Sequence, residues 1–190
     1  MTIKAGEKLP SVNFKKFDVD RLSDISSESY CKGRKVALFS VPGAFTPTCS
    51  AQHVPGYVDN AAALKAKGVS AIACVAVNDA FVMQAWGEQL GVGEEVEMLA
   101  DGNGEFARAT GLTLDGSGFG LGERSTRFSM LIDDGTVVEL NVEENPTKVG
   151  VSGAEHMLGQ LLTNLAHRDY RPRWEQGAGA HGGGTGRIET

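Results

Sequence analysis

Cysteine is scarce in this sequence: the 190 residues contain only three, Cys31, Cys49 and Cys74. Three cysteines cannot form a disulfide framework, and no CxxC pair marks a zinc site or a dithiol motif. We therefore expect free thiols in a reducing compartment, the cytoplasm, and no metal site.

Positive charge and long apolar runs are also scarce. The chain has 18 Lys and Arg against 24 Asp and Glu, which gives a formal net charge of −6. That balance argues against nucleic acids and anionic membranes as partners. No apolar run approaches the length of a membrane span, and Met1–Pro10 lacks the basic-then-apolar layout of a secretory signal.

What is present suits one globular domain. The composition is 41% hydrophobic and 22% charged, and 190 residues can bury a sizeable core. We expect this domain to cover residues 1–167. Residues 168–190 form a C-terminal extension, and Gly177–Gly186 consists almost entirely of Gly, Ala and His. Such a segment buries too little apolar surface to fold, so the Gly-rich end is expected to be disordered.

Apolar runs and turn residues predict alternating strands and helices. The predicted strands are Ser11–Phe14 at a sheet edge, Lys35–Val41, Val69–Val77, Glu97–Ala100, and a hairpin of Arg127–Asp133 with Thr136–Val142. The predicted helices are a short one within Arg21–Tyr30, one from Cys49 to Gly68 kinked at Pro55, Asp79–Leu90, Gly104–Thr110, and one from Ser152 or Gly153 to Ala166; Leu112–Gly122 is predicted to be a loop. This order predicts an α/β fold with a central mixed β-sheet flanked by helices.

The junction Val41–Ser50 carries the chemistry. A buried strand ends at Pro42-Gly43, Thr46 is suited to be the N-cap of the next helix, and Pro47 suits its first position. Cys49 then lies in the first turn, where unpaired N–H groups and the helix dipole favour the thiolate, the reactive form of cysteine.

Three other residues could make Cys49 functional. The Thr46 hydroxyl shares its turn, and Pro42 can shield a small pocket from water. An arginine could complete a positive environment. Arg127, which follows the long loop, is well placed, and Arg124 is the next candidate.

The spacing Pro42-x-x-x-Thr46-x-x-Cys49 resembles the PxxxTxxC signature of peroxiredoxins. Pro42–Ser50 is similar to the form found in the type II, peroxiredoxin-5-like subfamily. The resemblance continues through Lys65–Gly68, Val77–Phe81 and Arg127–Met130. It covers roughly Ile3 to Leu162, leaving only the tail outside.

The resemblance implies a thioredoxin-like fold and a thiol-specific peroxidase that needs no cofactor. Cys49 would attack H₂O₂ or an alkyl hydroperoxide and become a sulfenic acid. Thr46 would hydrogen-bond the peroxide and the sulfur, Pro42 would cover the pocket, and Arg127 would stabilise the thiolate and the polarised O–O bond. The backbone N–H groups of Thr48 and Cys49 would add donors.

The resemblance leaves the reductant open. Animal members of the subfamily carry a resolving cysteine that would fall near Gly150–Gly153, where this chain has none. A 1-Cys cycle completed by glutathione or glutaredoxin is therefore favoured, while a thioredoxin-linked cycle through Cys74 or Cys31 stays open. The family also implies a homodimer, to which Phe45 or Trp86 could contribute.

Three other hypotheses compete with the peroxidase. His53, one helical turn from Cys49, could make a cysteine hydrolase, although a triad needs further groups. A non-catalytic thioredoxin-like binding module would have a Cys49 of ordinary reactivity. A metal site of Cys49, His53 and Cys74 lacks a fourth ligand at usual spacing.

Overall fold

The computed structural model describes residues 1–18 and 21–169 of the chain. The expected disorder of Gly177–Gly186 therefore lies outside the described residues. None of the helices described within these ranges combines the length and apolar composition needed to cross a bilayer.

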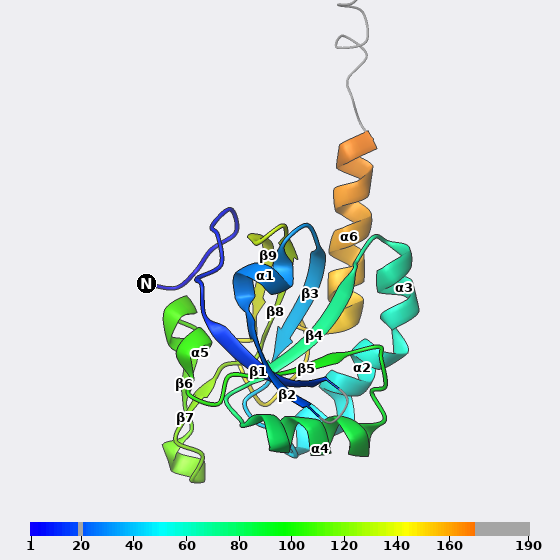
Figure 1. Cartoon of the computed structure of the whole chain (residues 1–190). Coiled ribbons are helices and arrows are strands. Elements are labelled where there is room, and N and C mark those ends of the chain that lie inside the picture. Colours follow the sequence, from blue (N-terminus) through cyan, green and yellow to red (C-terminus); the bar gives the residue numbers. More distant parts are fainter. Residues whose placement is uncertain (19–20, 170–190) are drawn as a thin grey trace, which may run out of the picture.

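A seven-stranded mixed sheet forms the centre of the protein (Figure 1). Its order is β2-β1-β5-β4-β3-β8-β9, where the strands are β1 (Asn13–Asp18), β2 (Arg21–Ser26), β3 (Lys35–Ser40), β4 (Ala71–Ala76), β5 (Glu97–Ala100), β8 (Phe128–Asp133) and β9 (Thr136–Val142). The central strands β3, β4 and β5 are parallel, and β8 joins β3 in antiparallel register. The expected mixed sheet is confirmed.

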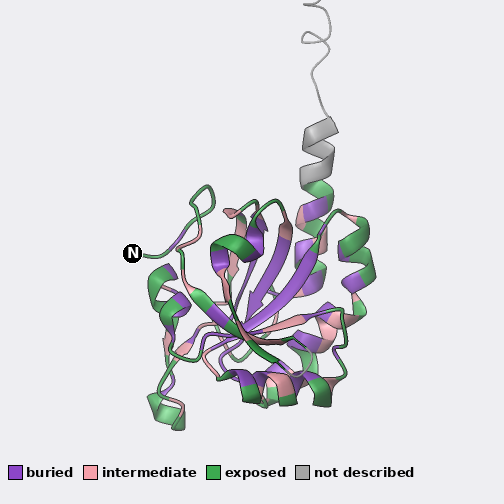
Figure 2. Ribbon diagram, viewed as in Figure 1, coloured by how far each residue is buried: buried purple, intermediate pink, exposed green. Residues whose placement is uncertain are grey.

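Burial on both faces explains the parallel centre of the sheet. All six residues of β4 are buried, and the middle of the sheet is buried throughout in Figure 2. Alternate side chains point to opposite faces and enter two separate cores. One, the first core, contains Phe39, Tyr57 and Trp86; the other, the second core, contains Tyr30, Phe106 and Phe128.

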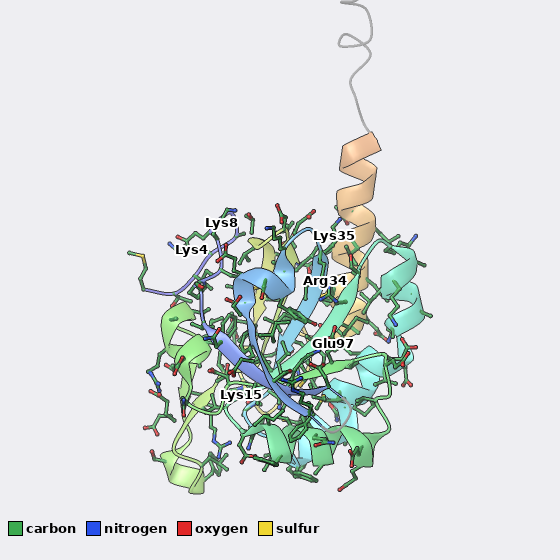
Figure 3. All side chains as sticks on the ribbon, viewed as in Figure 1. Lys4, Lys8, Lys15, Arg34, Lys35 and Glu97 are labelled. Atoms are coloured by element: carbon green, nitrogen blue, oxygen red, sulfur yellow. The ribbon has the colours of Figure 1, made fainter. Side chains whose placement is uncertain are left out.

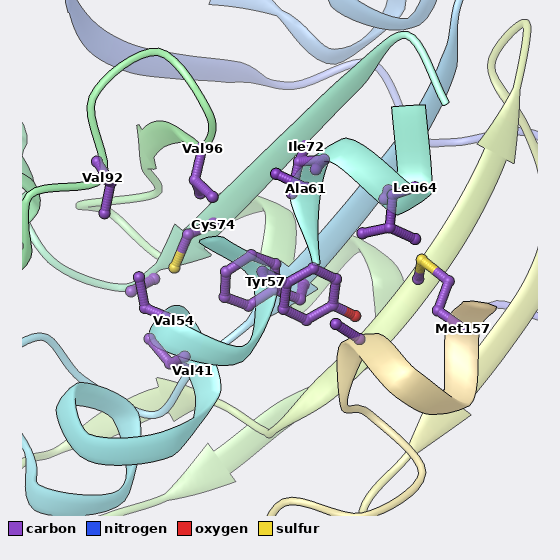
Figure 4. Packing of buried hydrophobic residues seen from close by; sticks show 14 of the residues in the cluster. Val41, Val54, Tyr57, Ala61, Leu64, Ile72, Cys74, Val92, Val96 and Met157 are labelled. Carbon is purple, nitrogen blue, oxygen red and sulfur yellow. The ribbon is translucent and has the colours of Figure 1, made fainter. Parts of the chain in front are cut away.

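Helices cover both faces. Side chains of α2 (Val54–Asp59), α3 (Ala61–Ala66), α4 (Ala80–Leu90) and α6 (Ala154–Asp169) enter the first core, part of which is shown in Figure 4. Side chains of α1 (Ser27–Cys31) and α5 (Glu105–Thr110) enter the second. Helix α4 begins as expected, with the Asp79 side chain accepting from Val82 N. The β8–β9 turn is also confirmed, since Asp134 and Gly135 both have positive φ, 47° and 76°.

Charged side chains surround this core (Figure 3). Glu97 on β5 accepts from Lys16 and from Arg34, both at 3.2 Å. Such partly exposed ion pairs are worth at most about 1 kcal/mol each. The stability of the fold therefore comes mainly from the two apolar cores.

Two sequence predictions were wrong. The short helix expected within Arg21–Tyr30 is present as α1, but it begins only after Ser26, whose side chain accepts from Ser29 N. The residues before it form strand β2, which pairs with β1 and was not predicted. Consequently β2, not the segment beginning at Ser11, forms the sheet edge. Ladder hydrogen bonds to β1 satisfy the β2 backbone, and this tertiary pairing overrides local helix propensity.

The second wrong prediction concerns Leu112–Gly122, expected to be a loop. It contains β6 (Thr113–Asp115) and a 3₁₀ turn (Ser117–Phe119), and β6 pairs with β7 (Glu123–Ser125) in a separate two-stranded sheet. The Gly and polar residues that suggested a loop form the turn between these short strands.

Candidate active site

The helix that carries Cys49 begins in an irregular form. It starts at Pro47, and Cys49–His53 is π-helical, with Val54 N donating to Cys49 O. Pro55 has no N–H with which to continue a regular helix, so the backbone widens just before it. The irregularity expected at Pro55 is therefore present, as a wide turn on the Cys49 side of the proline.

Thr46 lies just before this helix, and its carbonyl accepts from Ser50 N at 3.0 Å. Its side chain does not cap the helix, which corrects the sequence prediction. The Thr46 hydroxyl is instead 2.8 Å from Cys49 Sγ and 2.8 Å from Gly43 O. One hydroxyl hydrogen faces two acceptors, so the hydroxyl can turn from the carbonyl to the sulfur.

Arg127 completes the surroundings of the sulfur. Cys49 is fully buried, and Arg127 Nη2 lies 3.2 Å from Cys49 Sγ. The Arg127 Nε donates to Pro146 O at 2.8 Å. Arg124, the second candidate, donates to the carbonyls of Val77 and Leu121 instead. Of the two arginines, the structure therefore brings Arg127 to Cys49.

His53 binds the remaining nitrogen of the Arg127 guanidinium, Nη1, and the sequence did not suggest this contact. Arg127 Nη1 donates to His53 Nδ1 at 2.9 Å, which assigns the ring hydrogen to Nε2, 3.0 Å from Ser152 O. Burial lowers the pKa of His53 to about 4, so the ring is neutral and can accept from the arginine. Both ring nitrogens are engaged away from Cys49, so the Cys–His pair of a hydrolase is not formed.

The buried His53 predicts a pH-dependent stability. Its pKa is 6.5 in the ordinary state and about 4 when folded, so between these values the unfolded chain binds a proton that the folded chain excludes. The free energy of unfolding is therefore unaffected by His53 above pH 6.5, and it decreases by about 3 kcal/mol as the pH falls towards 4. Denaturant unfolding between pH 4 and 7 should show this extra loss, and His53→Gln should lack it. His156→Gln, at an exposed position, should behave as the parent.

A cavity of about 300 Å³ lies beside Thr46 and Arg127, the two residues that contact the Cys49 sulfur. Its lining is formed by Pro42, Thr46, Pro47, Thr48, Leu114, Asp115, Gly116, Phe119, Leu121, Arg127, Pro146 and Thr147. Pro42 is buried in this lining, and Phe119 is exposed at 84%. A larger cavity of about 520 Å³ between α4 and β5 has none of the candidate residues in its lining.

The other two cysteines are free, buried and differently placed. Cys74, labelled in Figure 4, belongs to the first core. Cys49 belongs to that core too, whereas Cys31 belongs to the second core on the opposite face of the sheet. Burial raises the pKa of Cys74, and it raises the pKa of Cys31 to about 11. Neither thiol is prepared to act as a nucleophile in this conformation.

The remaining candidates are also located. The Thr48 hydroxyl donates to Thr147 O at 2.9 Å, which ties the start of the helix to the loop after β9. Trp86 is fully buried and donates to Ser50 Oγ, so it cannot touch a partner subunit, which corrects its suggested role. Phe45 is 48% exposed.

No group of His, Cys, Asp and Glu within residues 1–18 and 21–169 is arranged to hold a metal ion.

Comparison with known proteins gives consistent matches. Residues 4–158 match the Redoxin family. The chain is 50% identical over 165 residues to Peroxiredoxin-2E-2, chloroplastic, of Oryza sativa subsp. japonica, covering 84% of this chain and 73% of the relative. It is 46% identical over 160 residues to Peroxiredoxin-2B of Arabidopsis thaliana, covering 84% and 98%.

Solved structures agree. Reduced Prx3 from Vibrio vulnificus in complex with H₂O₂ is 48% identical, has a TM-score of 0.80, and is matched over 84% of this chain and 99% of that chain. Peroxiredoxin 5 from Alvinella pompejana is 35% identical with a TM-score of 0.75, over 85% and 99%.

A thioredoxin-like sheet that presents a buried cysteine at a helix start defines a cysteine-based redox protein. With these relatives, the chain belongs to the peroxiredoxins, the thiol-dependent peroxidases that act in antioxidant defence. Its similarity is to the type II, peroxiredoxin-5-like kind.

Proposed function

We propose that Cys49 is the peroxidatic cysteine of this peroxidase and that Thr46, Arg127 and Pro42 complete its site. The observation that carries this proposal is the pair of contacts on one buried sulfur, Thr46 Oγ1 at 2.8 Å and Arg127 Nη2 at 3.2 Å, beside an open cavity. Both groups donate hydrogen bonds that favour a negative sulfur, and both remain available to the oxygen atoms of a peroxide.

The reaction follows from this arrangement. The Cys49 thiolate attacks the terminal oxygen of the hydroperoxide, so an S–O bond forms while the O–O bond breaks. Cys49 becomes a sulfenic acid, and the leaving alkoxide or hydroxide takes up a proton to give an alcohol or water. Arg127 stabilises charge on the leaving oxygen, and the N–H groups of Thr48 and Cys49 add donors at the same place.

The cavity supports alkyl hydroperoxides as well as H₂O₂ as substrates. Leu114, Phe119 and Leu121 contribute apolar side chains to its lining, and Thr46 and Arg127 contribute polar ones. An alkyl group can lie along the apolar part while the peroxide group meets Cys49.

Replacing Thr46 by valine tests the hydroxyl. The variant keeps the shape of the side chain but cannot donate to the sulfur or the peroxide, so the rate constant for peroxide reduction should fall about 10- to 100-fold with little change in folding. Stopped-flow measurement with excess thiol checks this. Thr163→Val, an exposed site on α6, is the matched control. A Thr46→Val rate equal to that of the parent would mean that the hydroxyl serves only packing.

We further propose a 1-Cys cycle. A thiol such as glutathione attacks the Cys49 sulfenic acid, releasing water and leaving a mixed disulfide. A second glutathione, or glutaredoxin, then attacks the glutathione sulfur of this mixed disulfide. This step releases the Cys49 thiolate and forms a disulfide between glutathione and the attacking thiol. Support comes from Cys31, which lies in the core on the opposite face of the sheet from Cys49, and from Cys74, which is fully buried within strand β4. To form a disulfide with Cys49, the Cα atom of either cysteine must come within roughly 7 Å in a suitable orientation.

The double variant Cys31→Ala/Cys74→Ala should therefore keep glutathione- or glutaredoxin-supported turnover close to that of the parent. Alanine is chosen because both thiols are buried, and a serine hydroxyl would lack a partner. After one equivalent of peroxide, mass spectrometry should find Cys49 as a sulfenic acid or glutathione adduct. A dominant Cys49–Cys74 disulfide, with a double variant that stops after one turnover, would instead support the thioredoxin-linked cycle.

We also propose that the protein acts in the cytoplasm as a homodimer. The free cysteines support a reducing compartment. Phe45 supports an interface on the active-site side, because this apolar side chain is 48% exposed close to Cys49 in the sequence. Sedimentation of the parent and of Phe45→Asp tests the dimer: a parent with the mass of one chain contradicts it.

A further inference from the structure

Main-chain carbonyl groups of the loop between β9 and α6 accept hydrogen bonds from side chains of the candidate active site. Pro146 O accepts from Arg127 Nε at 2.8 Å, and Thr147 O accepts from Thr48 Oγ1 at 2.9 Å. Ser152 O accepts from His53 Nε2 at 3.0 Å and from the Tyr57 hydroxyl at 2.9 Å. The loop therefore orients the arginine, the start of the Cys49 helix, and the histidine that supports the arginine.

A single carboxylate shapes this loop. One oxygen of Glu143, Oε1, accepts from Gly150 N at 2.6 Å, from Ser152 N at 2.8 Å and from Ser152 Oγ at 2.7 Å. The backbone N–H of Glu143 donates to Arg127 O at 3.0 Å, so the two residues are neighbours across adjacent strands. No ion pair between the Glu143 carboxylate and the Arg127 guanidinium is formed in the described structure. The Glu143 carboxylate therefore binds the loop, and the Arg127 guanidinium keeps its hydrogen bond to the Cys49 sulfur.

We propose that Glu143 is a positioning residue for the peroxidase reaction, acting through Ser152, His53 and the loop carbonyls on Arg127. It closes residues 143–152 into the shape that points the Ser152 carbonyl at His53. That carbonyl fixes the ring hydrogen on Nε2 and leaves Nδ1 as the acceptor that holds Arg127 Nη1. The inference rests on the proposed role of Arg127 at Cys49.

The charge on Glu143 suits this role. Burial alone raises the pKa of Glu143, but the hydrogen bonds from Ser152 and Gly150 outweigh it and hold that pKa below its usual value. The carboxylate is thus ionised at neutral pH, where its hydrogen bonds to N–H groups are strongest.

Glu143→Ala should slow the reaction of Cys49 with H₂O₂ on the order of 10-fold or more, since a small displacement of a catalytic group is enough for such a loss. Glu143→Gln keeps an oxygen acceptor in the same place and should restore the rate to within about threefold of the parent. Glu144→Ala removes the same charge from the neighbouring exposed residue and should match the parent.

A double-mutant cycle with Arg127→Gln separates positioning from general destabilisation. If Glu143 acts through Arg127, adding Glu143→Ala to Arg127→Gln should slow peroxide reduction no further. Additive losses, or a Glu143→Ala rate equal to that of Glu144→Ala, would overturn the proposal. If Glu143→Ala melts below the assay temperature, Glu143→Asp against Glu144→Asp gives the same comparison. A normal rate for Arg127→Gln itself would reject the proposed role of Arg127, whereas a slow Arg127→Gln beside a normal Glu143→Ala rejects only the role of Glu143.

Discussion

Replacing Cys49 by serine will abolish peroxidase turnover. A serine hydroxyl has no accessible anion near neutral pH, so even with Thr46 and Arg127 in place no nucleophile remains to attack the peroxide. The side chains are nearly the same size, so the buried site should pack as before. Peroxide consumption with excess thiol measures the effect, which should reach the uncatalysed background.

Cys74→Ser provides the matched control for Cys49→Ser. It makes the same chemical change in the same core, whereas the hydrogen bonds from Thr46 and Arg127 go to the sulfur of Cys49. We expect it to lower stability while the folded fraction stays active. More than a few per cent of the parental rate in Cys49→Ser would contradict the assignment of Cys49.

Replacing Arg127 by glutamine should slow peroxide reduction about 10²- to 10³-fold, the usual effect of removing one donor aimed at developing negative charge. The shorter, neutral side chain cannot keep the contact that Arg127 Nη2 makes with Cys49 Sγ at 3.2 Å. It also leaves His53 Nδ1 without its partner. Stopped-flow measurement of peroxide reduction, compared with the parent, checks this loss.

Arg124→Gln distinguishes this effect from the loss of any nearby arginine. Arg124 is half-buried and donates to carbonyl groups, as Arg127 does, but it makes no hydrogen bond to Cys49. Its variant should retain rapid peroxide reduction. A slow Arg124→Gln together with a normal Arg127→Gln would show that the wrong arginine was chosen.

The parts of the fold that the sequence predicts well are those with a strong local pattern. The apolar run Lys35–Val41 became β3, Glu97–Ala100 became β5, and Asp79 caps α4. Within Arg21–Tyr30 the expected short helix starts later than predicted, and strand β2 was missed because the structure of its short, polar-rich sequence is decided by pairing with β1, which lies outside the segment. Local propensity is weak beside such tertiary hydrogen bonds.

The candidate site divides in the same way. The spacing of Pro42, Thr46 and Cys49 lies within one strand–helix junction, so a single stretch of sequence brings these residues together. Arg127 could be proposed but not chosen with certainty over Arg124, because only the pairing of β8 with β3 brings it beside the helix. His53 was considered as a partner of Cys49, since the two share a helix face, whereas its ring turns to Arg127 and Ser152.

The sequence by itself determined the candidate nucleophile with its threonine and proline neighbours, and the α/β class, since each depends on residues close together in the chain. Only the tertiary structure decided which arginine meets the sulfur, which way His53 faces, and that Glu143 shapes the loop beneath both. Those contacts join residues separated by 78 positions for Arg127 and Cys49 and by 99 for His53 and Ser152. Side-chain hydrogen bonds between such distant residues depend on how the strands and helices pack, which no local pattern encodes.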